Sequence, residues 1–113
     1  MGIPSKIYQA VIDLDKHLSE NYPVYAENKP LEIGVYTQLL SMGYDDCAVE
    51  LKRCLARHCN RSDYLFNMLS EESRYDLITG KPVDKISDQS KAHSIEILKR
   101  IEKNRIKRGG KNG

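Results

Sequence analysis

The stretch ELKRCLARHCNRSDYL, from Glu50 to Leu65, decides the fold of this 113-residue chain. It begins within an apolar stripe at helical spacing, flanked by Cys47 and Cys54 and made of Ala48, Leu51 and Leu55. The acidic pair Asp45 and Asp46 suits the start of this helix, as a cap and as charge at its positive end. A shorter helix with Tyr64, Leu65, Met68 and Leu69 should follow, and its cap candidates are Asn60, Ser62 and Asp63. The stretch therefore predicts two consecutive helices.

The other side of the first helix carries a basic ridge, which consists of Lys52, Arg53, Arg57 and Arg61. Arg53 and Arg57 are four residues apart, and Arg61 continues the row if the helix reaches that far. An acidic protein surface and phosphate groups both fit such a ridge. Phosphate is the more common partner, because the guanidinium fork matches its oxygens.

Upstream, Pro4 and Ser5 suit the start of a helix whose apolar stripe is Ile7, Val11, Leu14 and Leu18. It should end near Asn21, because the residue before Pro23 is pushed out of the helical region. A polar connector is expected from there to Lys29.

Pro30 suits the first turn of another helix, with a stripe of Leu31, Val35, Leu39 and Met42 and a stop at Gly43. Gly34 falls inside this predicted helix, where glycine costs about 1 kcal/mol relative to alanine. Gly34 marks either a close approach of a backbone or ligand, or a neutral position.

Downstream, the apolar residues Tyr75, Leu77, Val83 and Ile86 flank the turn cluster Thr79–Pro82. This pattern predicts a β-hairpin, which must pack on the helices to be stable. Ser87 and Asp88 should cap a last helix that frays past Ile106, with core positions Ile95, Leu98, Ile101 and Ile106. The fold class is thus mainly α with a small β-hairpin and about five helices.

Positive charge gathers at the C-terminal end. The net charge is +2, but residues 98–113 hold seven basic residues and one acidic residue, Glu102. This asymmetry indicates an anionic partner or a solvated terminus that binds nothing specific. Charge alone leaves both interpretations open.

Several classes of function are not indicated. The three cysteines lack CxxC spacing, and the acidic pairs fall at predicted helix boundaries, so no metal, cofactor or enzyme activity is expected. No apolar run approaches the length of a membrane helix, about 18 residues. Charges interrupt residues 1–18, so no export signal is expected either. We expect a cytoplasmic protein without membrane contact.

Three segments in order resemble the ProQ/FinO domain of bacterial RNA chaperones. They are KPLEIGVYTQLL (Lys29–Leu40), ELKRCLARHCNRSDYL (Glu50–Leu65) and SRYDLITGKPVDKIS (Ser73–Ser87), followed by a helix with Ala92 and His93. The resemblance covers about Lys29 to Lys103 and implies a compact helical domain with a hairpin. It also implies binding of structured RNA, such as a terminator-like hairpin with a single-stranded 3′ tail, and pairing of small regulatory RNAs with their targets.

The resemblance also implies roles for single residues. Lys52 matches a basic residue of the family's RNA-binding face, Tyr64 its pocket tyrosine, and Arg74 the arginine that opens the hairpin. The remaining expected RNA-binding residues are Lys29, Gly34, Arg53, Arg57, Arg61 and Lys81. Asp63 and Ala56 stand where the family often has basic residues, which lowers the positive charge of this face.

The expected organisation is an N-terminal helix and connector (1–28), an RNA-binding domain (29–103) and a basic, flexible tail (104–113). The expected function is RNA binding and post-transcriptional regulation by a monomer without an obligate protein partner. One alternative is a helix-turn-helix DNA-binding protein, although the second helix has few side chains suited to reading base edges. Another is a protein-interaction module whose basic end docks on an acidic partner.

Overall fold

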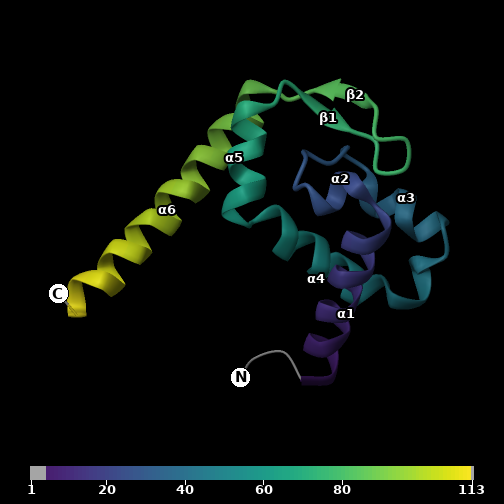
Figure 1. Cartoon of the computed structure of the whole chain (residues 1–113), viewed down its shortest axis with the longest axis horizontal. Coiled ribbons are helices and arrows are strands. Elements are labelled where there is room, and N and C mark those ends of the chain that lie inside the picture. Colours follow the sequence, from purple (N-terminus) through teal and green to yellow (C-terminus); the bar gives the residue numbers. More distant parts are fainter. Residues whose placement is uncertain (1–4, 113) are drawn as a thin grey trace.

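The computed structural model describes the backbone of residues 5–112 and the side chains of residues 9–107. The larger helices are α1 (Ser5–Asn21), α3 (Val35–Ser41), α4 (Ala48–Cys59), α5 (Ser62–Ser70) and α6 (Asp88–Asn112). A one-turn helix α2 (Pro23–Ala26), a 3-10 turn η1 (Tyr44–Cys47) and the antiparallel strands β1 (Ser73–Tyr75) and β2 (Pro82–Lys85) complete the fold (Figure 1). The predicted fold class is confirmed, with α2 as an addition. Pro4 lies outside the described residues.

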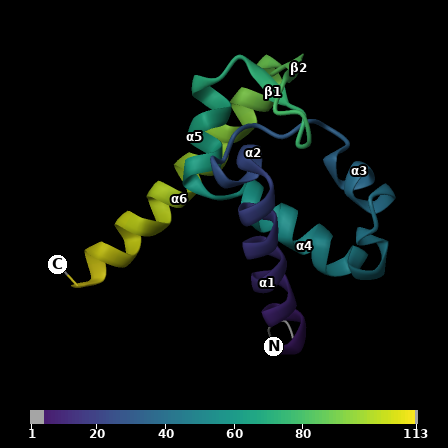
Figure 2. The ribbon, with the colours of Figure 1, turned by 45° about the vertical axis from the view of Figure 1, so that its right-hand side comes forward.

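The core lies where α1 and α4 cross and is closed by α2 and α5 (Figures 1 and 2). Val11 and Leu18 of α1 and Leu51 and Leu55 of α4 are all buried, as their helical spacing predicted. The helix ends that proline and glycine predicted are confirmed as well, since α1 ends at Asn21 and α3 ends before Gly43.

The connector after α1 is not a polar loop as predicted. Its residues Val24 and Tyr25 are buried, and the Tyr25 hydroxyl donates a 2.6 Å hydrogen bond to Asp15 on α1. The Tyr25 ring stacks on His58 of α4, with 3.8 Å between the ring centroids. A buried aromatic ring thus fastens the connector to both helices.

The predicted helix start at Pro30 was wrong. Leu31 instead forms a parallel bridge with Tyr75 of β1, where the Tyr75 amide donates to the Pro30 carbonyl at 2.8 Å. The helix begins at Val35, and Gly34 precedes it in the left-handed conformation, with φ of 106°. No atom lies within 4 Å of where a Cβ on Gly34 would stand, so its backbone conformation explains the glycine better than a close approach does.

The predicted caps of the two middle helices were also wrong. Asp45 and Asp46 lie in η1, and Cys47, the residue before α4, makes no side-chain cap hydrogen bond. Arg61 precedes α5 in an extended conformation, again without a side-chain cap. Asn60 instead follows the C-terminal end of α4, where its side-chain amide donates a hydrogen bond to the Ala56 carbonyl at 2.7 Å.

The hairpin places Ser73 opposite Lys85 and Arg74 opposite Asp84, with an irregularity before Tyr75. Leu77 and Ile86 are buried beneath it. In the loop, the Asp76 carboxylate accepts hydrogen bonds from the amides of Ile78 and Thr79. These bonds lower the pKa of Asp76.

Helix α6 starts where the sequence predicted it, since the Ser87 hydroxyl accepts a hydrogen bond from the Ser90 amide at 3.1 Å. The Lys91 ammonium donates to the carbonyls of Leu69 and Glu71 at 3.0 and 2.7 Å, which ties α6 to the end of α5. Beyond α5 the helix projects from the body (Figures 1 and 2). The radius of gyration is accordingly 15.5 Å, against about 13 Å for a compact domain of this size.

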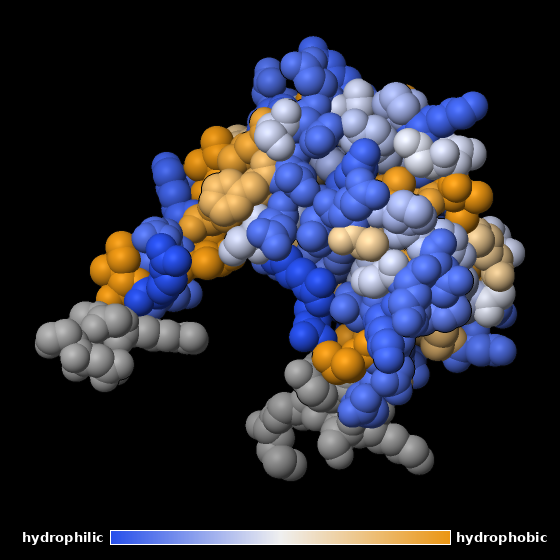
Figure 3. Space-filling view, viewed as in Figure 1, coloured by the Kyte–Doolittle hydropathy of each residue, from blue (hydrophilic) through white to orange (hydrophobic). Residues whose placement is uncertain are grey.

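The course of α6 differs from the predicted one in two respects. The helix continues past Ile106 to Asn112. Ile95 and Ile106, predicted as core, are 42% and 64% exposed, although α5 packs against this helix. Apolar surface therefore lies open along α5 and α6, on the left of Figure 3.

The part of the chain that the structure describes contains no helix with the length and hydrophobicity needed to cross a membrane. It also contains no cluster of side chains suited to hold a metal ion. All three cysteines are free thiols, with Cys54 buried and Cys47 and Cys59 half-buried.

Candidate functional site

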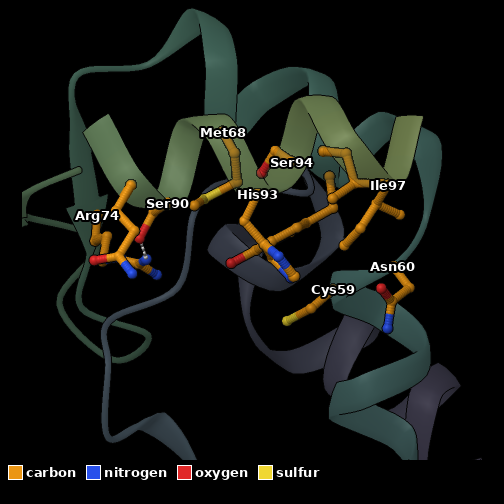
Figure 4. A pocket seen from close by; sticks show the side chains of 11 residues that line it. Cys59, Asn60, Met68, Arg74, Ser90, His93, Ser94 and Ile97 are labelled. Atoms are coloured by element: carbon orange, nitrogen blue, oxygen red, sulfur yellow. Dashed lines mark hydrogen bonds between the residues drawn. The ribbon is translucent and has the colours of Figure 1, made fainter. Parts of the chain in front are cut away.

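A cavity of about 490 Å³ lies where the end of α4, α5, β1 and the first turns of α6 meet. Figure 4 shows Arg74 and Ser90 at one end of it, Cys59 and Asn60 at the other, and His93 between them. Tyr64 and Met68 of α5 and Gln89, Ser94 and Ile97 of α6 complete most of its wall. Two of the predicted site residues, Tyr64 and Arg74, thus meet at one cavity.

Tyr64 is a buried part of this wall, with 5% of its surface exposed. Its hydroxyl accepts a 3.1 Å hydrogen bond from the backbone amide of Leu31. Burial raises the pKa of Tyr64, so the hydroxyl keeps its proton at neutral pH. With so little surface exposed, Tyr64 shapes the wall more than it offers an open ring for stacking.

Arg74 holds two structural elements together beside the cavity. Its guanidinium donates to the Leu31 carbonyl at 3.0 Å and to the Ser90 hydroxyl at 3.2 Å. Ser90 in turn accepts a 3.0 Å hydrogen bond from the Ser87 hydroxyl at the start of α6. The planar guanidinium is therefore fixed between the 30–32 segment and α6.

Apart from Gln89, the α6 side of the cavity consists of residues at helical spacing, namely Ser90, His93, Ser94 and Ile97. Their positions follow the order i, i+3, i+4 and i+7, which places them on one face of the helix. Of these residues, only His93 belonged to the segments that resemble the ProQ/FinO domain. The spacing was visible in the sequence, but a row of two serines and one histidine does not stand out from an ordinary solvated face.

The basic ridge leads along α4 toward this cavity. Lys52, Ala56 and Cys59 follow each other at i, i+4 and i+7 on α4, so Lys52 shares a helix face with a residue of the cavity wall. The row of Arg53, Arg57 and Asn60 has the same spacing and also ends at the wall. Lys52, Arg53 and Arg57 are exposed.

Arg61 does not continue the ridge, because α4 ends at Cys59 and the chain turns before Arg61. Its guanidinium lies 3.0 Å from the Asp15 carboxylate on α1. Burial works against ionisation of Asp15, but hydrogen bonds from Tyr25 and Arg61 lower its pKa overall. Arg61 thus pairs with α1 in a partly exposed contact.

The other three expected residues lie outside the cavity wall. The Lys29 ammonium sits 4.8 Å from the centre of the Tyr75 ring and 3.8 Å from the Glu27 carboxylate. Gly34 is exposed before α3, and Lys81 is exposed in the hairpin loop. The structure therefore does not group these three with Tyr64 and Arg74.

His58 lies behind the cavity wall and was not expected in the core. It is 1% exposed, it stacks on Tyr25, and its ring edge faces Tyr64 at 5.5 Å between centroids. Neither ring nitrogen has a hydrogen-bond partner. Burial, aided by the nearby Arg61, lowers the pKa of His58 to about 4, so the ring is neutral at pH 7.

Comparisons with known proteins agree with this fold. The model of the ProQ/FINO family matches residues 8–110. Among solved structures, the chain is similar to NMB1681 from Neisseria meningitidis MC58, described as a FinO-like RNA chaperone. The TM-score is 0.70 at 24% identity, over 77% of this chain and 92% of that one. No curated protein matches the sequence.

The family match spans nearly the whole chain and includes most of α1, all of α4, the residues that line the cavity and most of α6. The chain therefore belongs to the ProQ/FINO family.

Proposed function

We propose that this protein binds structured RNA, with the phosphates of a hairpin stem on the exposed face of α4 and the single-stranded 3′ end in the cavity. In this role it acts as a monomer that promotes pairing between small regulatory RNAs and their targets. One observation carries the proposal. Two neighbouring rows of α4 residues, which start at Lys52 and Arg53, both end at the cavity wall, at Cys59 and Asn60.

The α4 face suits the stem. An A-form RNA helix hides its base edges in a deep, narrow groove, so proteins recognise its phosphates and 2′-hydroxyls. Lys52, Arg53 and Arg57 bring positive charge to such a backbone without reading sequence. Because about 1.5 Å separates successive residues along a helix, the face from Arg53 to Asn60 spans roughly 10 Å and places the stem next to the cavity.

The cavity suits a nucleotide at the end of a chain. Its volume of about 490 Å³ lies within the usual range for small-molecule sites, roughly 300–1,000 Å³. Asn60 and Gln89 each offer a donor and an acceptor to the free hydroxyls of a ribose, and the Ser90 hydroxyl, which accepts from Arg74 and Ser87, offers a donor. Gln89 and Ser90 also belong to the first turn of α6, where the positive end of the helix dipole favours an anion such as phosphate.

The cavity wall is favourable for an anion in charge as well. Among the described side chains that line it, Arg74 is basic and none is a carboxylate. Arg74 keeps its orientation through Leu31 and Ser90, so a bound phosphate meets a guanidinium that is already in place.

The basic residues of 104–113 form a further part of the proposal. The basic end beyond the 29–103 domain, which is helical to Asn112, would add phosphate contacts that do not depend on sequence. Ending the chain after Lys103 should then make RNA affinity less dependent on salt. An unchanged salt dependence would remove the tail from the proposal.

The test is binding of the full chain to a hairpin RNA with a 3′ oligouridine tail, compared with the same RNA blocked by a 3′ phosphate. Tighter binding to the free end supports recognition of the 3′ terminus, and equal affinity overturns that part. Unlabelled duplex DNA serves as competitor in the same titration. If DNA displaces the RNA as well as unlabelled RNA does, the protein has no preference for RNA and the proposal fails.

A further inference from the structure

A second cavity, of about 530 Å³, lies between α5 and α6 and shares no lining residue with the first. Its floor is apolar and consists of Phe66, Leu69, Ile95, Leu98 and Ile101. We call this surface the α5/α6 groove. It corresponds to the apolar area over these two helices in Figure 3.

The groove is built as two sides of a helix bundle without a third. Phe66 is 58% exposed and Ile95 is 42% exposed, so the described part of the chain leaves both side chains largely uncovered. On α5 the groove residues are Ser62, Phe66 and Leu69, at i, i+4 and i+7, and on α6 they include Ile95, Leu98 and Ile101. Two adjacent helices with apolar rows of this kind leave a groove between them, into which the apolar stripe of another helix fits.

The charge of the residues around the groove determines whether an acidic or a basic helix fits it better. Residues 99–107 of α6 hold one acidic residue, Glu102, and five basic ones: Lys99, Arg100, Lys103, Arg105 and Lys107. Of these residues, Lys99, Glu102 and Arg105 line the groove, and Glu102 is paired with Arg105 at 2.9 Å, so the lining carries a net charge of +1. A second copy that laid its own α6 there would bring like charges together, whereas an acidic helix would bring opposite charges.

We propose that the α5/α6 groove binds an acidic amphipathic helix of another protein, with its apolar stripe on Phe66 and Ile95 and its carboxylates near Lys99 and Arg105. The role is separate from RNA binding at α4 and the first cavity. An exposed aromatic residue in an apolar depression with a charged rim is typical of a protein contact site.

The probe for the test is a synthetic 18-residue helical peptide, labelled with fluorescein, with leucine on one face and glutamate on the others. Two control peptides carry the same residues in scrambled order, or lysine in place of glutamate. Fluorescence anisotropy with the full chain should show binding of the acidic amphipathic peptide and no binding of either control.

The variant Phe66→Ser should weaken binding of the acidic peptide by about tenfold or more, as expected when an aromatic anchor is truncated. Val49→Ser is the matched control, because Val49 is 59% exposed at the start of α4, outside the groove. Unchanged affinity of Phe66→Ser for hairpin RNA shows that this variant is folded. Arg105→Glu should also weaken the acidic peptide, because it reverses a charge on the rim.

Other outcomes overturn the proposal. They are failure of the acidic peptide to bind, or equal binding by the wild type and Phe66→Ser. Dimerisation in sedimentation experiments that Phe66→Ser abolishes would assign the groove to a second copy. Binding to anionic lipid vesicles that Phe66→Ser abolishes, without binding of the peptide, would assign it to a membrane surface.

Discussion

The hydroxyl of Tyr64 on α5 accepts a hydrogen bond from the backbone amide of Leu31, 33 residues earlier in the chain, at 3.1 Å. The carbonyl of Leu31 accepts a bond from Arg74 at 3.0 Å. Both polar backbone groups of one buried residue are therefore held by two side chains that the family resemblance singled out. This arrangement ties the cavity wall to the 30–32 segment, so a change at Tyr64 or Arg74 affects the fold as well as any ligand.

Tyr64→Phe should lower the free energy of unfolding by about 1–3 kcal/mol, the cost of a buried donor without a partner. Leu31 is 2% exposed, so water cannot easily replace the lost hydroxyl. Urea denaturation measures the effect. Tyr36→Phe is the matched control, because the Tyr36 hydroxyl makes one long, 3.4 Å bond to a carbonyl and leaves no buried amide unpaired. Equal losses in both variants would contradict the prediction.

Arg74→Lys should abolish the preference for a free RNA 3′ end while leaving the salt dependence of binding unchanged. Lysine keeps the charge but lacks the planar fork that bridges the Leu31 carbonyl and the Ser90 hydroxyl. Titrations with free and 3′-phosphorylated hairpin RNA measure the preference. Arg100→Lys, at an exposed position of α6, makes the same substitution away from the cavity and should retain the preference. Retention of the preference by Arg74→Lys would count against the role of the fork.

The double variant Lys52→Ala/Arg53→Ala should reduce the slope of log K against log salt by about 1.4–1.8, since each phosphate contact contributes roughly 0.7–0.9. The loss of affinity should be similar for stems of different sequence, because these residues contact the backbone. Lys16→Ala/Lys85→Ala, at exposed positions of α1 and β2, removes the same number of positive charges elsewhere and controls for the loss of net charge. A slope equal to that of the wild type would show that α4 does not hold the stem.

His58 should make the fold less stable as the pH falls from about 6.5 to about 4. Its pKa is 6.5 in an unfolded chain and about 4 in the fold, chiefly because of burial. The unfolded chain therefore binds a proton first, and roughly 2–3 kcal/mol of stability is lost over this interval. His58→Phe keeps an aromatic ring against Tyr25 and removes the titrating nitrogens, so its stability should vary less with pH. Thermal denaturation from pH 7 to pH 4 gives both profiles, and parallel profiles would contradict this account.

Part of the fold was predictable from the sequence because it depends on interactions between residues close together in the chain. The end of α1 at Asn21, the hairpin around Thr79–Pro82 and the start of α6 at Ser87 all depend on residues within a few positions of each other. The apolar stripes of α1 and α4 were predictable for the same reason, since helical periodicity places their residues on one face.

Part of the candidate site was predictable only through the family resemblance. The resemblance singled out Tyr64 and Arg74, which line one cavity. It did not indicate that Tyr64 is almost fully buried and holds Leu31, because that bond joins residues far apart in the chain. The polar wall residues Asn60, Gln89 and Ser90 went unrecognised, because polar residues at helix ends usually face solvent.

The sequence by itself determined the helix periodicity, the hairpin, the basic face of α4 and the basic C-terminal end. Only the tertiary structure decided that Leu31 pairs with Tyr75, that Arg61 turns to Asp15, and that His58 lies in the core. The tertiary structure also decided that one face of α6 lines the polar cavity while the next face forms the α5/α6 groove. Periodicity determines which residues of a helix share a face, but the partner of each face depends on how distant segments pack together.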